Sequence, residues 1–368
     1  MNNIMKYINH NKKDINDIFD NIDIKKLNLT NRKLLSLPIE LGNLINLTEL
    51  DLTDNELTNV DIIGNLINLK KLFLSNNNIS ILPILINNLT KLEILELSYN
   101  KLQNLPTEFG NLSNLQELYL SNNLLCDIPP TIGNLIKLRE LNLPNNNLQN
   151  LPIQISNLVK LEYLNLTNNQ LSCLPLTIGN LSNLVYLDLD KNQLEILPIS
   201  IGNLLNLREL YLSNNKITYL EPSICNLNNL IHLHLENCKL QTLPIEIAKL
   251  INLEELDLTN NLLLNLPIEI GNLTNLNILC LKYNKLCSLP KEILKIKNSL
   301  DIDITSYDFD NINYIQNQIL IFTFLNFEIQ NVPFYIEEIW IEQENKKVFF
   351  KKIPFNCKIK YLFKNNSY

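Results

Sequence analysis

One phrase recurs along this chain with small changes, and its period constrains the fold more than any other feature. LPIELGNLINL begins at Leu37, LPISIGNLLNL at Leu197 and LPIEIGNLTNL at Leu266. Aligned on their leucines, the units step by 23 residues, except for one step of 22 between Leu47 and Leu69. A chain of 368 residues would ordinarily suggest about two globular domains, but a fixed period of this kind predicts a solenoid of stacked coils.

The full repeat reads LxxLxLxxNxLxxLPxxIGNLxN. The alternation xLxLx predicts a short strand whose leucines point to one face and whose variable residues point to the other. The next asparagine predicts a turn, because its amide can pair with backbone groups that would otherwise be buried unpaired. The LP pair predicts an extended return segment, and xxIGNLxN a short helical or 3₁₀ turn. One unit alone cannot bury both leucine rows, so stability must come from stacking.

The repeat resembles the leucine-rich repeat family, and its LPxxIGNLxNL segment is similar to the intracellular Ras-suppressor or Shoc2-like class. The resemblance covers residues 24–305, which hold twelve units and a terminal half. It implies an α/β leucine-rich-repeat solenoid, a curved horseshoe with a parallel β-sheet on its concave face and short helical or 3₁₀ turns on its convex face. Two units depart from the pattern at the asparagine position, which Arg32 and Cys238 occupy.

The two ends of the chain differ from the repeats. Residues 1–23 are expected to form a short N-terminal cap over the first unit. Residues 306–368 change to aromatic and β-branched runs, which predict a β-rich C-terminal cap or appendage with a hairpin at the break Glu344-Asn345. Within it, residues 345–368 hold seven lysines and no acid. This segment could bind anionic lipid or nucleic acid, or it could be a solvated lysine face that protects a sheet edge.

Charge and composition narrow the function classes. A net charge of -7 argues against a general affinity for nucleic acid or anionic membranes and favours a basic or mixed-charge partner. No apolar run is long enough for a signal peptide or a membrane span, so a cytoplasmic, monomeric protein is expected. Seven cysteines without a CxxC pair predict neither a zinc cluster nor a disulfide framework.

The sequence contains no motif that is typical of an enzyme active site. All seven glycines occupy one register of the repeat, so none remains for a phosphate-binding loop. His232 and His234 share one strand, and Glu255 and Asp257 hold the equivalent places one unit later. These are metal-ligand types, but residues two apart on a strand diverge from the compact geometry that zinc prefers, so an ordinary ligand-contact face is favoured. No catalytic residue, cofactor or metal is therefore expected.

The variable residues of the predicted strand should determine which partner binds. The third, fifth, seventh and eighth places of the units hold twelve acids and four bases, so this face has a net charge of -8. Aromatic residues share the face, and large stiff side chains give contact area at low entropic cost. The predicted partner-binding site is an aromatic patch with an acidic rim: Tyr163, Tyr186, Glu209, Tyr211, His232, His234, Glu255 and Asp257. A secondary partner-binding site is expected at Phe73, Tyr99 and Tyr119.

These observations predict a non-enzymatic protein–protein interaction scaffold or adaptor with a role in signalling. The family resemblance implies a small GTPase or its effector as the partner. Two alternatives stay open: a structural repeat protein without a specific ligand, and association with anionic lipid or nucleic acid through the lysine-rich end.

Overall fold

The computed structural model describes residues 23–286, residues 290, 292, 293 and 296, and the backbone of six later strands. The predicted N-terminal cap lies almost wholly outside the described residues. The chain divides into two compact units, Met1–Leu187 (unit 1) and Asp188–Tyr368 (unit 2), which are described separately.

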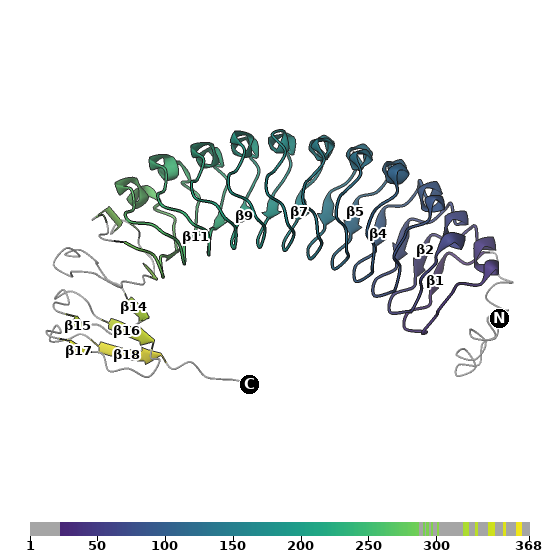
Figure 1. Ribbon diagram of the computed structural model, residues 1–368, viewed down its shortest axis with the longest axis horizontal. Coiled ribbons are helices and arrows are strands. Elements are labelled where there is room, and N and C mark those ends of the chain that lie inside the picture. Colours follow the sequence, from purple (N-terminus) through teal and green to yellow (C-terminus); the bar gives the residue numbers. More distant parts are fainter. Residues whose placement is uncertain are drawn as a thin grey trace. The chain divides into compact units, whose positions relative to one another are not determined.

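Unit 1 is built on a ladder of parallel three-residue strands (Figure 1). Neighbouring strands pair in register one repeat apart, so that Leu27 lies opposite Leu50 and Leu141 opposite Leu164. The strands are β1 (Lys26–Asn28), β2 (Glu49–Asp51), β3 (Lys71–Phe73), β4 (Ile94–Glu96), β5 (Glu117–Tyr119), β6 (Glu140–Asn142) and β7 (Tyr163–Asn165). Strand β8 (Tyr186–Asp188) contains the boundary between the units.

Unit 2 continues the same pattern with β9 (Glu209–Tyr211), β10 (His232–His234), β11 (Glu255–Asp257) and β12 (Ile278–Cys280), all parallel. Parallel pairing goes on through β13 (Leu300–Asp301), β14 (Ile319–Thr323), β16 (Glu338–Glu342) and β18 (Lys358–Leu362). A separate parallel pair joins β15 (Glu328–Ile329) to β17 (Phe349–Phe350).

The hairpin predicted at Glu344-Asn345 is wrong. The strands on either side of that break, β16 and β17, belong to different sheets and both pair in parallel. The turn residues alone suggested that the two flanking strands pair with each other in antiparallel fashion. Instead, each strand pairs in parallel with a strand further away along the chain, as in the repeats. The assignment of residues 306–368 as a cap stays a prediction.

Short 3₁₀ turns occupy the opposite side of each repeat from the strands (Figure 1). Most of them begin right after the LP proline, because proline holds the chain extended at that point, as at Pro106 with φ -61° and ψ 148°. In unit 1 they are η1 (Ile39–Asn43), η2 (Asp61–Asn65), η3 (Ile84–Asn88), η4 (Thr107–Asn111), η5 (Pro130–Asn134), η6 (Ile153–Asn157) and η7 (Ile178–Asn180). In unit 2 they are η8 (Ile199–Asn203), η9 (Pro222–Asn226), η10 (Ile245–Lys249) and η11 (Ile268–Asn272).

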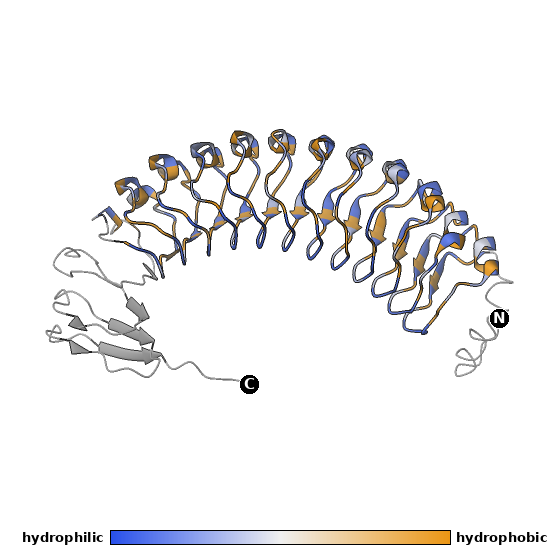
Figure 2. Ribbon diagram, viewed as in Figure 1, coloured by the Kyte–Doolittle hydropathy of each residue, from blue (hydrophilic) through white to orange (hydrophobic). Residues whose placement is uncertain are grey.

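The core lies between the strands and the turns of each repeat. The middle leucine of every strand from β2 to β11 is fully buried, while its two neighbours are partly exposed. Figure 2 shows the resulting alternation of hydrophobic and hydrophilic segments within each repeat. Close packing between coils favours glycine at Gly110, where a Cβ would lie 2.2 Å from the carbonyl oxygen of Thr131 in the next repeat. The structure is the solenoid that the repeat predicts.

The asparagine ladder is confirmed in detail. Asn169 Nδ2 donates to the carbonyl oxygens of Leu143 and Leu166, each at 3.0 Å, and its Oδ1 accepts the Leu148 N–H at 3.0 Å. At the substituted position, Cys238 Sγ donates to the Leu212 carbonyl oxygen at 3.3 Å. These side chains tie each coil to the one before it, which keeps the strand register constant along a unit.

Candidate functional site

The structure brings six of the eight predicted partner-binding residues together on strands β9 to β11 of unit 2. Strand register places them in two rows, because the third and fifth places of successive repeats lie directly opposite one another. The buried middle leucines point into the core, so both rows face the open side of the sheet. We call this cluster the strand face of unit 2: Glu209, His232 and Glu255 in one row, and Tyr211, His234 and Asp257 in the other.

Tyr211 lies on β9, at one edge of the strand face, and is held on two sides. Its hydroxyl donates a hydrogen bond of 2.8 Å to Glu209 Oε2, and its ring meets the His234 ring edge-on, with centroids 4.8 Å apart and planes at 82°. Burial, the hydrogen bond to Glu209 and nearby acids raise the pKa of Tyr211 well above its usual value. The phenol therefore remains protonated, and its orientation is set before any partner arrives.

His234 carries a ring nitrogen that is not hydrogen-bonded. Its Nε2 atom lies 3.2 Å from Glu255 Oε1, which is an ion-pair distance, but the geometry is not that of a hydrogen bond. The nitrogen is also shielded from solvent.

Acids surround this cluster. Asp190 accepts the Ser213 backbone N–H at 2.6 Å, and burial together with the nearby Asp188 carboxylate raises the pKa of Asp190 to about 6. Among the described residues of unit 2, the third, fifth, seventh and eighth places hold six acids and two lysines. A surface of this composition attracts cations and basic segments.

The two remaining residues of the predicted site belong to unit 1 and form a pair of their own. The Tyr163 and Tyr186 rings stack with centroids 4.2 Å apart and planes 9° from parallel. Because both hold the third place of consecutive repeats, the strand spacing itself brings the rings to stacking distance. A single patch formed by all eight residues stays a prediction.

The residues of the predicted secondary site are spread over strands β3 to β5 and the turn after β4. Phe73 and Tyr119 lie two strands apart, each paired with Glu96 between them. Tyr99 follows β4 and is 60% exposed, with a positive φ of 54° at a place where most repeats have asparagine. A bulky side chain in this conformation is unusual, because its Cβ crowds the backbone.

Several types of site are not found in the described part of the chain. No group of three or more His, Cys, Asp or Glu side chains there is arranged to hold a metal ion. No described helix is long and apolar enough to cross a membrane. Four of the described cysteines are free thiols: Cys126, Cys173, Cys225 and Cys238. Burial raises the pKa of Cys225 to about 12, so this thiol is unreactive.

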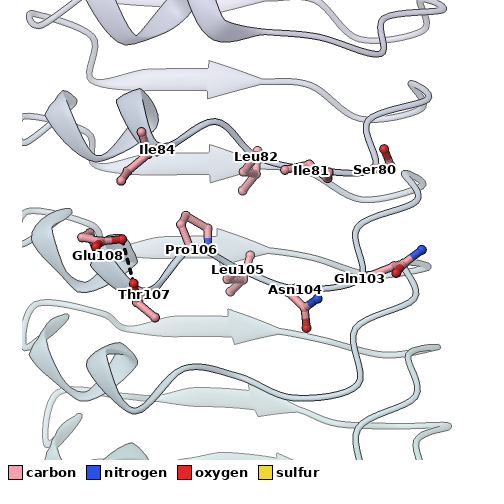
Figure 3. A pocket seen from close by; sticks show the side chains of 10 residues that line it. All are labelled: Ser80, Ile81, Leu82, Ile84, Gln103, Asn104, Leu105, Pro106, Thr107 and Glu108. Carbon is pink, nitrogen blue, oxygen red and sulfur yellow. Dashed lines mark hydrogen bonds between the residues drawn. The ribbon is translucent and has the colours of Figure 1, made fainter.

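Sequence reasoning missed a groove on unit 1. It lies between two consecutive repeats, on the segments that run from the asparagine turn to the 3₁₀ turn (Figure 3). Residues 80–82 and 84 form one wall and residues 103–108 the other, around a volume of about 560 Å³. We call it the flank groove. Exposed isoleucines beside the LP pair, such as Ile81 and Ile84 at 75% and 61%, were the available signal.

Comparison with known proteins supports the architecture. The family profile described as leucine-rich repeat region matches residues 55–143, 127–219 and 177–262. A search of curated proteins gives no match.

Solved structures with similar folds include bacterial and plant proteins. A leucine-rich repeat protein of Leptospira interrogans is 33% identical, with a TM-score of 0.62, and the match covers 84% of this chain and 93% of that one. An internalin of Listeria monocytogenes is 25% identical over 77% of this chain and 82% of that one, with a TM-score of 0.67. The ectodomain of the Arabidopsis thaliana receptor kinase GASSHO1/SCHENGEN3, in complex with Casparian strip integrity factor 2, is 26% identical with a TM-score of 0.70. That match covers 93% of this chain but 47% of the ectodomain chain.

Proposed function

This chain belongs to the leucine-rich repeat family, and we propose that it is a non-enzymatic interaction module that binds a partner protein on the strand face of unit 2. Proteins built from such repeats generally mediate protein–protein interactions, because a rigid sheet of variable side chains offers an extended binding surface. The Arabidopsis ectodomain was solved with a bound factor, which is consistent with this general use of the fold.

The observation that supports this location is the arrangement around Tyr211. An aromatic ring that is fixed by Glu209 and His234 loses little conformational entropy on binding, so it can act as an anchor. The carboxylates of Glu255 and Asp257 lie on β11, next to the strand of His234, and would draw in a basic group. The partner we propose is therefore a protein with a basic or mixed-charge surface.

Three finer statements belong to the same proposal. A cytoplasmic location is supported by the free thiols of Cys126, Cys173, Cys225 and Cys238, since a reducing compartment keeps thiols unpaired. A scaffold role in signalling, with a small GTPase or its effector as the partner, is supported by the likeness of LPxxIGNLxNL to the Ras-suppressor or Shoc2-like class. The acidic strand face makes nucleic acid an unfavourable ligand there.

The test is affinity purification from the native host with the intact chain, followed by binding measurements on the recovered partner. Tyr211→Ala should weaken that partner by about 2 kcal/mol or more, roughly 30-fold in Kd, because the ring supplies the central contact. Tyr219→Ala is the matched control, since Tyr219 is a 46% exposed tyrosine of the same unit that lies outside the strands.

Two outcomes would contradict the proposal. In one, Tyr211→Ala binds the partner as tightly as the parent chain. In the other, Tyr219→Ala weakens binding to the same extent, which would place the contact on the flank of the repeats. Recovery of no specific partner across repeated purifications would favour the purely structural alternative.

A further inference from the structure

The flank of unit 1 has an unusual combination of exposed side chains. The flank comprises the segments that lead into the 3₁₀ turns: residues 35–40, 58–62, 80–85, 103–108, 126–131, 149–154 and 172–177. Aliphatic side chains on it are widely exposed, including Ile39 and Ile81 at 75% and Leu176 at 78%. The same segments contain four acids, Glu40, Asp61, Glu108 and Asp127, and neither lysine nor arginine. A scattered exposed leucine is ordinary, but aliphatic residues aligned with charges of one sign indicate a binding surface.

The flank groove is the hollow part of this surface. Ile81 and Ile84 form its aliphatic wall, and the opposite wall combines Pro106 with the amide side chains of Gln103 and Asn104 (Figure 3). The volume of about 560 Å³ lies within the range of ordinary ligand sites, roughly 300–1,000 Å³. Glu108 closes one end, where its Oε2 accepts the Thr107 hydroxyl at 2.8 Å.

A buried amide lies on the same turn as Ile84. Asn87 occupies the glycine position of η3, is only 6% exposed, and has no hydrogen-bond partner for either Nδ2 or Oδ1. A Cβ on Gly64 or Gly110 would meet the residue 21 places later. The same offset leads from Asn87 to Glu108, which closes one end of the groove, although Asn87 itself is not among the residues that line it. Unpaired buried polar atoms are costly, and they are commonly retained where a ligand or water supplies the missing partner.

We propose that the flank groove binds an extended segment of a partner protein in which aliphatic and basic side chains alternate. In an extended chain, successive side chains point to opposite sides. One set would pack on Ile81, Ile84 and Pro106, while the other would meet Glu108 at one end of the groove and Asp127, which holds the place of Asn104 one repeat later. The amides of Gln103 and Asn104 can donate to and accept from the peptide backbone.

The charge of the flank decides between possible occupants. An acidic segment would be repelled by every charged group in the seven flank segments, and a purely apolar one would leave the Glu108 carboxylate without a basic partner. A basic and aliphatic segment satisfies both the apolar wall and the carboxylates.

The probe for this test is a fluorescein-labelled peptide of alternating leucine and lysine, titrated with the full chain by fluorescence anisotropy. Two control peptides replace lysine with glutamate or leucine with serine. The double variant Ile81→Ser, Ile84→Ser should weaken the leucine–lysine peptide about tenfold, because two aliphatic contacts are lost. The matched control is Ile153→Ser, Leu176→Ser, which changes two exposed residues of the same flank outside the groove. That variant should bind as the parent chain does, and thermal melting confirms that both variants fold.

A labelled isoleucine methyl spectrum locates the peptide directly, and we expect the Ile81 and Ile84 signals to shift on titration. The proposal is overturned if the groove variant binds like the parent, if both double variants weaken binding equally, or if the leucine–glutamate peptide binds as well. The variant Glu209→Gln, Glu255→Gln separates this site from the strand face. If it abolishes binding while the groove variant does not, the groove proposal fails and the strand face of unit 2 keeps its proposed role.

Discussion

Replacing Cys238 with asparagine should make this protein more stable. Among the described repeats of unit 2, this is the one ladder position without an asparagine, and the replacement would restore it. At the equivalent place one repeat later, Asn261 Nδ2 donates to the carbonyl oxygens of Leu235 at 2.8 Å and Leu258 at 3.0 Å, and its Oδ1 accepts the Leu240 N–H at 3.0 Å. The Cys238 thiol makes one donor contact, to Leu212.

The size of the effect follows from counting these contacts. Asparagine adds one donor contact and replaces a weak sulfur acceptor with an amide oxygen for backbone N–H groups. A net gain of about 0.5–1.5 kcal/mol per hydrogen bond then predicts a stabilisation of about 1–2 kcal/mol. The change needs no new space, because neighbouring repeats hold asparagine in the same slot at similar burial, with Asn215 5% exposed and Asn261 3% exposed.

Chemical denaturation of the intact chain measures this difference, with the midpoint and the slope fitted separately because repeat arrays can unfold in parts. Asn261→Cys is the matched reverse change and should lose a similar amount. If Cys238→Asn lowers the midpoint while Asn261→Cys is neutral, the ladder hydrogen bonds are not the source of stability and the reasoning is wrong.

Two further changes test the ladder and the acidic rim. Asn169→Ala should lower the free energy of unfolding by about 1–3 kcal/mol, because it leaves buried backbone groups unpaired. Thr167→Ala should be close to neutral, because the Thr167 hydroxyl is buried without a hydrogen-bond partner. Equal shifts in melting temperature for the two variants would refute this. Asp190→Asn should raise the melting temperature at pH 7.5 and have little effect at pH 4. The native pKa of about 6 lies above the ordinary value of 3.8, so ionisation of Asp190 destabilises the fold. This destabilisation is complete above pH 6 and disappears as the pH falls from about 6 to 3.8. Because Asp190 is partly exposed, the gain should be at most about 1 kcal/mol, and an unchanged pH profile in the variant would show that Asp190 is not the group responsible.

The repeat pattern predicted the strands and turns because both are local. A leucine at every second place and an asparagine that satisfies the backbone act within a few residues, so one unit specifies its own shape and stacking only multiplies it. The same regularity predicted that Glu209, His232 and Glu255 share a row, since equivalent places of parallel strands lie side by side.

The particular contacts of the site required the tertiary structure. Tyr211 could have extended along its strand or across it, and the packing turned it toward Glu209 and His234. Asp190 looks like any other acid in the sequence, but its burial beside Asp188 raises its pKa. Neither result follows from periodicity, because each depends on the sizes of side chains in neighbouring repeats.

The amino-acid sequence by itself determined the period, the strand register and the acidic character of the variable face, because these depend on residue type at fixed spacing. Only the tertiary structure decided where the surface is hollow. The flank groove exists because residues 80–84 and 103–108 come from separate coils whose side chains leave a space between them. A volume of that kind depends on the distance between coils and on the shape of every side chain along it, and neither is written in the spacing of the repeats.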